Sequence, residues 1–268
     1  MLNGGLFSTV YTSAQVSFTL AEREARVPDL QEFGKNLWIA DGPLVRDMGL
    51  LFPTRMTVAK LSTGDLWLSS PVPVSPETLE HITDKGPVRY LVAGTPRHVW
   101  RLSEWHKLFP EAELWGPKPS PMTLNKERLP FTGILGDTPP AGWAADLDQL
   151  PFKGNPLIEE VVFLHKPSGT AILDDLIQNV PPLEGSPIRN AVFRVAGVAY
   201  PNGGVPLDGR LSFVHHAVAR RSLEKLLSWD FDKLIIAHGP CVEKDAKAFV
   251  ERAFSWLCRQ GAQRMSGL

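Results

Sequence analysis

The chain has 268 residues, of which 43% are hydrophobic, so it is long enough to bury a sizeable core. Its formal net charge is −1, and no basic stripe predicts nucleic-acid binding or attachment to a membrane surface. No apolar stretch approaches the roughly 20 residues that a transmembrane helix needs. We therefore expect a globular protein that binds a small molecule and binds neither nucleic acid nor membrane.

The N-terminus and the cysteines favour a cytoplasmic location. Residues 1–26 lack the basic n-region and continuous apolar h-region of a signal peptide. The only cysteines, Cys241 and Cys258, form no Cys-x-x-Cys pair, which excludes a disulfide framework. No flexible linker divides the chain, so we expect an N-terminal arm over residues 1–35 and a single domain over residues 36–268.

The first half of the domain is predicted to alternate between strands and helices. Ser75 as N-cap and Pro76 in the first turn predict a helix that the sequence Lys-Gly-Pro at 85–87 ends. A second helix is expected over residues 98–108. Strands are predicted over residues 36–40, 54–61, 66–70, 88–93 and 112–115. The strand, loop, helix and strand from 88 to 115 form a unit typical of parallel pairing.

The second half is predicted to hold a hairpin, two helices and one buried strand. Residues 117–155 are rich in Pro and Gly and predict no regular element. Strands over 160–164 and 170–173 flank a turn, a helix is expected over 211–228, and a last helix carries an apolar stripe around Phe249. Four consecutive apolar residues before His238 indicate a strand covered on both faces. The order of elements predicts an α/β layered sandwich.

Polar side chains with acid–base or metal-binding chemistry follow three of these strands. His98 follows the strand at 88–93, Asp174 and Asp175 follow the strand at 170–173, and His238 ends the last strand. Ligands in open α/β sheets bind at the carboxyl ends of strands, so these side chains are the candidates for a functional centre. His81 and His165 are expected at the surface instead.

This order of elements resembles the metallo-β-lactamase fold. The sequence LIIAHGP resembles the last ligand motif of that superfamily, and LDDLI resembles the strand whose aspartate bridges two metals. Over residues 34–258 the chain is more similar still to one branch of the superfamily, a domain of unknown function with a degenerate site. Four segments carry this similarity: HVWRLSEWHKLFPEAELWGP, LGDTPPAGWAADLDQL, EEVVFLHKPSGTAILDDLIQN and WDFDKLIIAHG.

The resemblance implies a fold and a set of metal ligands. The implied fold is a four-layer αββα sandwich of mixed sheets with helices on both outer faces. His238 matches the C-terminal histidine ligand and Asp175 the bridging aspartate. The motif His-x-His-x-Asp-His is missing, because only His98 remains and it falls where the motif has aspartate; residues 152–156 also lack the middle histidine. His98, Asp175 and His238 suffice for one divalent ion (zinc, iron or manganese), or the site holds none.

The function that this implies is hydrolysis of a small ester, lactone, thioester or amide at a site with at most one ion. His238 and Asp175 are the expected catalytic residues. Arg97, Trp100 and Cys241 are the candidates for substrate binding, and a helix N-terminus expected near Cys241 would lower the pKa of its thiol. Two alternatives stay open: a metal-free binding or scaffold protein, and a metal-independent enzyme that uses His238 or Cys241 in the same cleft.

Overall fold

The computed structural model describes residues 30–123 and 129–257 of the chain. Most of the predicted N-terminal arm, and Cys258, lie outside these ranges. The described end of this arm belongs to the first sheet, because Leu30–Gly34 forms strand β1 and pairs antiparallel with the next strand. The first sheet therefore begins at Leu30 rather than at residue 36.

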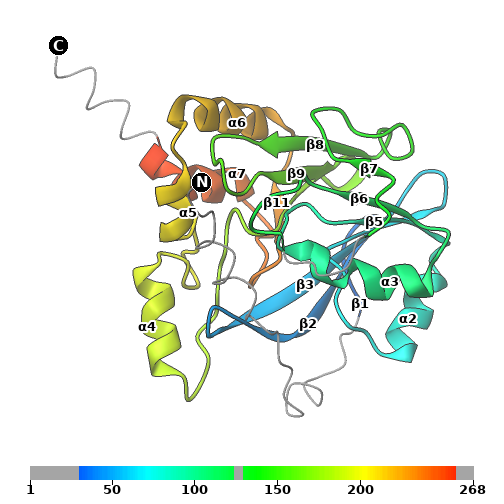
Figure 1. The fold of residues 1–268 in the computed structure, drawn as a ribbon, viewed down its shortest axis with the longest axis horizontal. Coiled ribbons are helices and arrows are strands. Elements are labelled where there is room, and N and C mark those ends of the chain that lie inside the picture. Colours follow the sequence, from blue (N-terminus) through cyan, green and yellow to red (C-terminus); the bar gives the residue numbers. More distant parts are fainter. Residues whose placement is uncertain (1–29, 124–128, 258–268) are drawn as a thin grey trace, which may run out of the picture.

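The first sheet has seven strands that lie in chain order (Figure 1). The first four strands pair antiparallel and the last four pair parallel, so the sheet is mixed. After β1 its strands are β2 (Leu37–Asp47), β3 (Leu50–Lys60), β4 (Leu66–Ser69), β5 (Val88–Val92), β6 (Glu113–Gly116) and β7 (Gly133–Ile134).

The second sheet has four strands in the order β11-β10-β9-β8. The predicted hairpin is confirmed as β9 (Glu160–His165) and β10 (Thr170–Leu173), joined by the 3-10 turn η2 (Lys166–Ser168), and β11 (Lys233–Ile236) pairs parallel with β10. Strand β8 (Leu147–Phe152) lies where the sequence predicted no element. Its antiparallel pairing with β9 along its whole length stabilises a strand whose own sequence, with Pro151, gives no strand signal.

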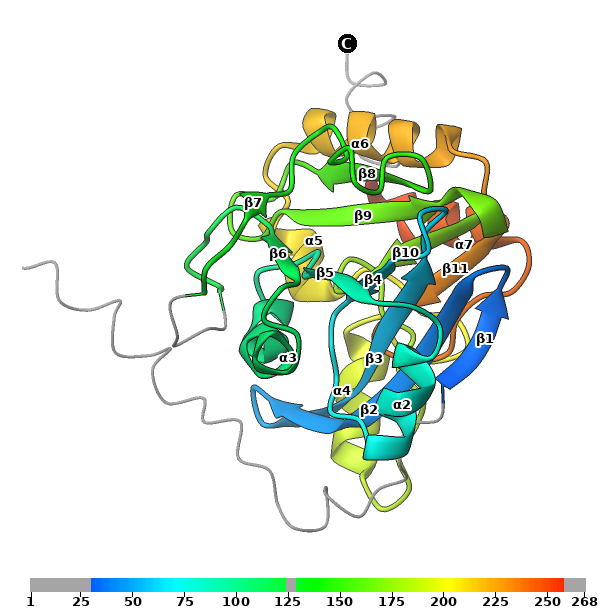
Figure 2. The ribbon, with the colours of Figure 1, turned by 90° about the vertical axis from the view of Figure 1, so that its right-hand side faces the viewer.

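Helices cover the outer face of each sheet, so the four-layer αββα sandwich is confirmed (Figures 1 and 2). On the first sheet lie α2 (Pro76–Thr83), η1 (His98–Arg101) and α3 (Leu102–Leu108). On the second sheet lie α6 (His216–Ser228) and α7 (Ala246–Ala253). Two further helices, α4 (Pro187–Val195) and α5 (Leu207–Ser212), lie beside the sandwich.

The single helix predicted over residues 211–228 is wrong, because α5 ends at Ser212 and α6 begins at His216. Phe213 takes an extended conformation and buries its ring against Phe152, at 5.9 Å between ring centroids. Burying this ring turns the backbone out of the helix. Consequently Leu211 is left exposed rather than on a continuous inward face.

The strands read as apolar runs because both of their faces are buried. In β9, Val161 and Phe163 point into the core between the sheets, whereas Val162 and Leu164 pack toward α6 and α7. The carboxyl ends of the two sheets' strands meet at one edge. The N–H of Val161 donates to the carbonyl of Gly94, just after β5, at 2.7 Å. This junction places the residues that follow β5 beside those that follow β10 and β11.

Within the described residues, no helix has the length and apolarity needed to cross a bilayer.

Candidate metal centre

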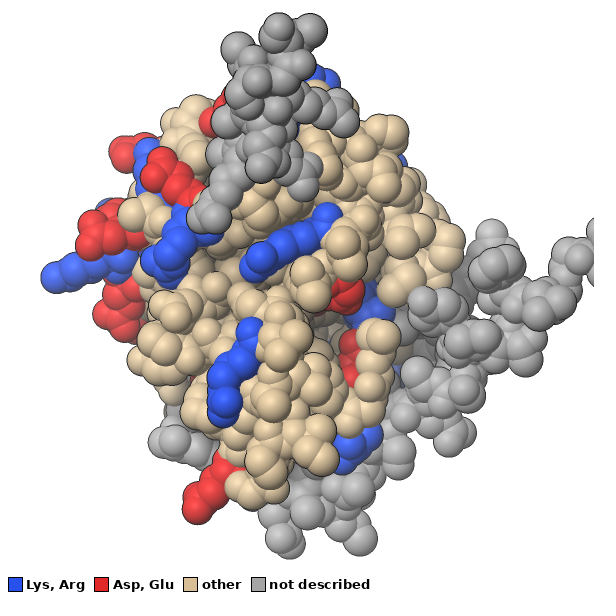
Figure 3. All heavy atoms as spheres, turned by 90° about the vertical axis from the view of Figure 1, so that its left-hand side faces the viewer, with Lys and Arg blue, Asp and Glu red and all other residues tan. Residues whose placement is uncertain are grey.

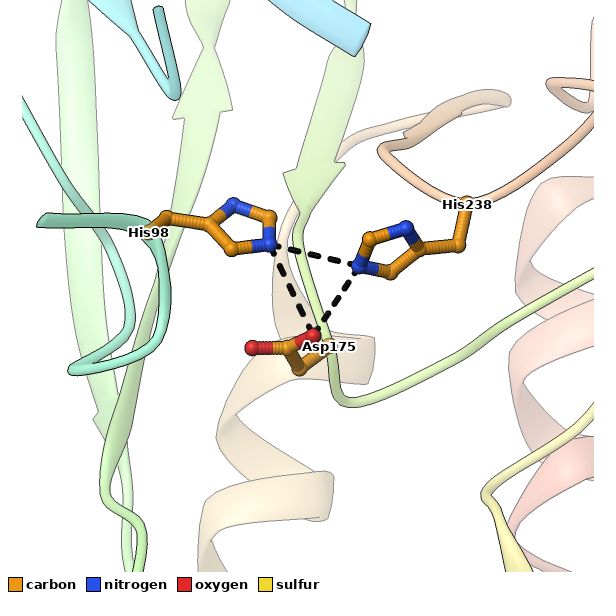
Figure 4. A group of neighbouring side chains, drawn as sticks. All are labelled: His98, Asp175 and His238. Atoms are coloured by element: carbon orange, nitrogen blue, oxygen red, sulfur yellow. Dashed lines mark hydrogen bonds and ion pairs between the residues drawn. The ribbon is translucent and has the colours of Figure 1, made fainter. Parts of the chain in front are cut away.

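The three residues predicted as ligands converge at this edge (Figure 4). His98 begins η1, and Asp175 and His238 lie in the loops that follow β10 and β11. The Nε2 atoms of the two histidines lie 3.2 Å apart. Oδ1 of Asp175 lies 3.0 Å from Nε2 of His238 and 3.6 Å from Nε2 of His98. Residues that are far apart in the chain thus present three ligand atoms to one point.

The partners of the other ring nitrogens fix how both imidazoles face. Nδ1 of His238 lies 2.7 Å from the carbonyl oxygen of Pro53, which only accepts, so Nδ1 carries the hydrogen. Nδ1 of His98 lies 2.8 Å from Oγ of Ser70, and that hydroxyl donates to Asp174 at 2.8 Å. His98 must therefore donate to Ser70 through Nδ1. Both Nε2 atoms are left to face Asp175, the arrangement found in metal-ligating histidines.

Asp175 is oriented by side chains on both sides of it. The hydroxyl of Thr95 donates to Oδ2 at 2.8 Å, which leaves Oδ1 to face the imidazoles. The carboxylate of Glu160 accepts the backbone N–H groups of Asp174 and Asp175 at 2.8 Å and that of Leu176 at 2.7 Å. Glu160 is only 2% exposed, so it fixes the turn after β10 from within the protein.

Arg55 holds the loop that carries His238. Its guanidinium donates to the carbonyl oxygen of Ile236 at 2.6 Å and to that of Gly239, on either side of the histidine. Asp41 completes the arrangement with an ion pair to Arg55 at 2.7 Å. Strand β3 thus supplies two contacts to the His238 loop, the Arg55 side chain and the Pro53 carbonyl.

Sequence reasoning missed most of these supporting residues. Ser70, Thr95 and Pro53 give no local signal, because each acts on a residue distant in the chain. Glu160 gives a local signal, because it is an acid directly before four consecutive apolar residues that are buried in a strand. Ser70 also has a backbone φ of 55°, which is uncommon for a residue with a side chain and marks the end of β4 as a special position.

The carboxylates and imidazoles of the site shift one another's pKa values. Burial disfavours a charged imidazole, but the carboxylates of Asp175 and Asp174 outweigh it and raise the pKa of His98 well above its usual value. Burial likewise opposes ionisation of Asp175, yet His98 and His238 hold the pKa of this carboxyl well below its usual value. For Glu160, burial and the two neighbouring aspartates raise the pKa. The site therefore favours positive charge beside Asp175.

The spacing of the ligand atoms fits one small ion. A tetrahedral zinc ion with bonds of about 2.0–2.1 Å separates its ligand atoms by about 3.4 Å, and the observed separations are 3.0, 3.2 and 3.6 Å. Two imidazole nitrogens and a carboxylate oxygen are ligands that zinc, iron and manganese accept. Within the described residues no second group of three such side chains lies this close. The cluster can thus hold one ion.

A cavity of about 790 Å³ opens over this cluster. His98, Glu160, Asp175 and His238 form its polar floor. Arg97 and Trp100, predicted to bind substrate, also line it, and Arg97 pairs with Asp47 on the β2–β3 hairpin. Most of the remaining wall comes from the β2–β3 hairpin, α4, α5 and the loop between these two helices. A small molecule in this cavity would reach the three ligand atoms.

Cys241, the third residue predicted to bind substrate, is not among the residues that line the cavity. Its thiol packs against the core between the sheets, with Nη1 of Arg55 at 3.1 Å from its sulfur. Burial raises the pKa of the Cys241 thiol, so the expected lowering is wrong. No helix begins at Cys241 either, because α7 starts at Ala246.

Solved structures of the same fold are similar to nearly the whole chain. A fragment of a diflavin flavoprotein from Nostoc sp. matches with a TM-score of 0.57 and 13% identity, over 90% of this chain and 100% of that one. A metallo-β-lactamase from Pontibacter korlensis matches with a TM-score of 0.56 and 13% identity, over 86% and 98%. The metallo-β-lactamase FIM-1 from Pseudomonas aeruginosa, in its mono-zinc form, matches with a TM-score of 0.55 and 13% identity, over 87% and 97%.

At such low identities these matches show the fold alone, and the fold is that of the metallo-β-lactamase superfamily. No curated protein sequence matches the chain. One sequence family does, over residues 41–190, which is more than half of the chain. The chain belongs to that family, which is described as a domain of unknown function, DUF4336.

Proposed function

We propose that this protein is a hydrolase with a single divalent metal ion, acting on a small ester, lactone, thioester or amide. The observation that carries the proposal is the convergence of Nε2 of His98, Oδ1 of Asp175 and Nε2 of His238 within 3.6 Å of one another, on the floor of a cavity. The metallo-β-lactamases of the same fold, one of them in a mono-zinc form, add support.

In the proposed mechanism, three residues hold the ion and two others keep the ligand atoms available. His98, Asp175 and His238 would hold the ion. Pro53 and Ser70 keep hydrogen on the two Nδ1 atoms, so that both Nε2 lone pairs stay available. When bound, a divalent ion would supply Lewis acidity toward a carbonyl group and toward water.

The cavity wall would position the substrate. Arg97 has its guanidinium at the cavity, held by Asp47, where it can donate to a carbonyl or carboxylate oxygen. Trp100 lines the same cavity and offers an apolar ring to the body of the substrate. These two residues bind and orient, whereas the three ligand residues hold the reacting centre.

Metal analysis tests the proposal. Protein purified without chelator and equilibrated separately with zinc, manganese and ferrous iron should retain close to one ion per chain of at least one metal. His238→Ala and Asp175→Ala should each lose it. His81→Ala is the matched control, because His81 is an exposed histidine on α2 outside the cluster. No retained metal under any condition, or retention in both ligand variants, would overturn the proposal.

A second candidate is a metal-independent enzyme in the same cleft. It is favoured by the 3.0 Å separation between Nε2 of His238 and Oδ1 of Asp175. Because Nδ1 already donates to Pro53, a proton taken up at Nε2 would be stabilised by this carboxylate, as a general base requires. Hydrolysis of a panel of phenyl esters, thioesters and lactones that survives full metal removal would favour this candidate. Turnover that is lost with the metal and restored by it would favour the first, and binding without turnover in both forms would favour a scaffold.

A further inference from the structure

We infer that the ligand of this cavity is amphipathic, with a polar head at the metal centre and an extended apolar chain along the mouth. The inference rests on the proposed function for its head group and names the class of substrate: an acyl ester or thioester with a long aliphatic chain. Its evidence is the chemistry of the cavity mouth, which is independent of the three ligand residues.

The mouth of the cavity is lined by apolar side chains that are exposed to solvent. Three elements contribute them: the β2–β3 hairpin, α4 and α5. Five large apolar residues both line the cavity and are exposed to solvent: Met48, Val192, Val195, Leu207 and Leu211. The exposed charged residues Arg46 and Asp208 lie among them. Large apolar side chains gathered around one opening are unusual on a protein surface and mark a binding site.

These side chains are continuous with the polar floor. Phe52 and Phe193 lie between the two levels, with their rings packed edge to face at 4.9 Å between centroids, and the ring of Phe52 also lies 5.9 Å from that of His238. Apolar side chains thus line a path from the ligand cluster to the exterior, beside the charged residues Arg46, Asp47, Arg97 and Asp208 that also line the cavity. Figure 3, which faces the side with α4 and α5, shows mostly uncharged side chains around a hollow that contains charged ones.

The size of the cavity argues against a compact substrate. A volume of about 790 Å³ is near the upper end for ligand sites, which run from about 300 to 1,000 Å³. A small acyl group at His98, Asp175 and His238 would occupy the floor and leave the exposed rim in water. An aliphatic chain of about ten carbons would cover that rim, and burial of apolar surface on both partners would strengthen binding.

The concave shape favours a single small molecule over a flat partner. A membrane or a second copy of the chain would cover Val195 and Leu211 at the rim but would not fill the space above His238. An aliphatic chain joined to a polar head would cover the rim and also fill the space above His238. These other occupants are therefore separate outcomes of the test.

The experiment measures binding of butyrate and decanoate, the product acids of short-chain and long-chain esters, by calorimetry on zinc-loaded and metal-free protein. Full burial of one methylene strengthens binding about fourfold, and an open rim that covers half of it gives about twofold. The six additional methylenes of decanoate should therefore strengthen binding roughly 50-fold or more. Equal affinities for the two acids would overturn the inference.

Two double variants make the test specific to the rim. In the first, Val195→Gln with Leu211→Gln, both residues line the cavity and are 78% and 76% exposed. In the matched control, Ile188→Gln with Val214→Gln, the residues are 79% and 60% exposed but lie outside the cavity. The first variant should reduce the preference for decanoate at least fivefold and leave butyrate unchanged, and the control should keep the full preference. The same loss in both would overturn the inference.

The result separates this inference from the proposed function. A chain-length preference in protein that retains no metal supports the amphipathic ligand and removes the hydrolase. One bound ion per protein without a chain-length preference supports the hydrolase and overturns the amphipathic ligand. Sedimentation with phosphatidylcholine vesicles that the first double variant abolishes would replace the small molecule by a membrane. A dimer, seen by light scattering, that this variant dissociates would replace it by a second copy; both outcomes overturn the inference.

Discussion

Both ends of the four-stranded sheet bury a histidine, but in opposite surroundings. His238 follows β11 at the end where the metal cluster lies, and its Nε2 contacts Asp175 and His98. His165 ends β9, which runs antiparallel to β10, so it lies at the other end of the sheet. There Nδ1 contacts only the hydroxyl of Ser168, at 2.7 Å, and Nε2 is buried without a hydrogen-bond partner among the described residues.

The difference shows what burial does to a histidine with and without carboxylates in direct contact with its ring. Burial lowers the pKa of His165 to about 4, against the weaker opposing effect of the Asp146 charge, so this ring stays neutral. At the other end, the carboxylates of Asp175 and Asp174 overcome the same effect and raise the pKa of His98 well above its usual value. The acids therefore distinguish the candidate functional end of the sheet from the structural end.

The largest expected effect concerns Glu160, which organises the functional end. Glu160→Ala would leave the backbone N–H groups of Asp174, Asp175 and Leu176 buried without acceptors. Each such group costs about 1–3 kcal/mol, so we expect the free energy of unfolding to fall by about 3–5 kcal/mol in urea denaturation. Glu160→Gln keeps one acceptor oxygen and should cost less than half as much. An unchanged midpoint in the alanine variant would contradict the assigned role.

The next prediction concerns the structural end. Between pH 6.5 and pH 4 the unfolded chain protonates His165 while the folded protein does not, so the free energy of unfolding falls as the pH is lowered. The shift in pKa from 6.5 to about 4 corresponds to about 3 kcal/mol. His165→Asn can still donate to Ser168 but does not titrate. Over this pH range its free energy of unfolding should therefore fall by about 3 kcal/mol less than that of the unaltered protein. Parallel stability curves for the two proteins would show that His165 does not titrate this way.

Metal affinity at the functional end should depend on Ser70. Ser70→Ala removes the acceptor for Nδ1 of His98 and frees the ring to turn, and loss of such a partner typically weakens metal affinity about 10- to 100-fold. Competition with a chromogenic zinc chelator measures it. Ser69→Ala is the matched control, because the neighbouring hydroxyl is buried and contacts no hydrogen-bond partner among the described residues. Equal affinities in the two variants would contradict the role of Ser70.

The smallest effect is expected at Thr95. Thr95→Val keeps the shape of the side chain but removes the hydrogen bond to Oδ2 of Asp175, which is worth about 1.5–3 kcal/mol for a charged acceptor. Since some of this free energy is recovered when the carboxylate rotates, we expect metal affinity to fall about three- to tenfold in the same competition assay. Thr95→Ser keeps the hydroxyl and should bind like the unaltered protein; weaker binding by both variants would point to packing instead.

Sequence patterns predicted the elements that carry their own signals. The strand before His238 and the helix begun by Ser75 were recognised from consecutive apolar residues and from capping, both of which are local. Strand β8 was missed because only its pairing with β9 makes it a strand. His165 was expected at the surface, and that prediction is wrong: it follows an apolar run whose burial extends to the turn, and it is fully buried.

The sequence by itself determined which residues stand at the strand ends, because apolar runs and the breakers that end them are local. It therefore identified His98, Asp175 and His238 and the absence of the motif that a second ion would need. Only the tertiary structure decided which ring nitrogens face the centre, because their partners are distant in the chain: Pro53 lies 185 residues before His238. The tertiary structure also determines the apolar mouth of the cavity, since α4, α5 and the β2–β3 hairpin meet there only in the folded protein.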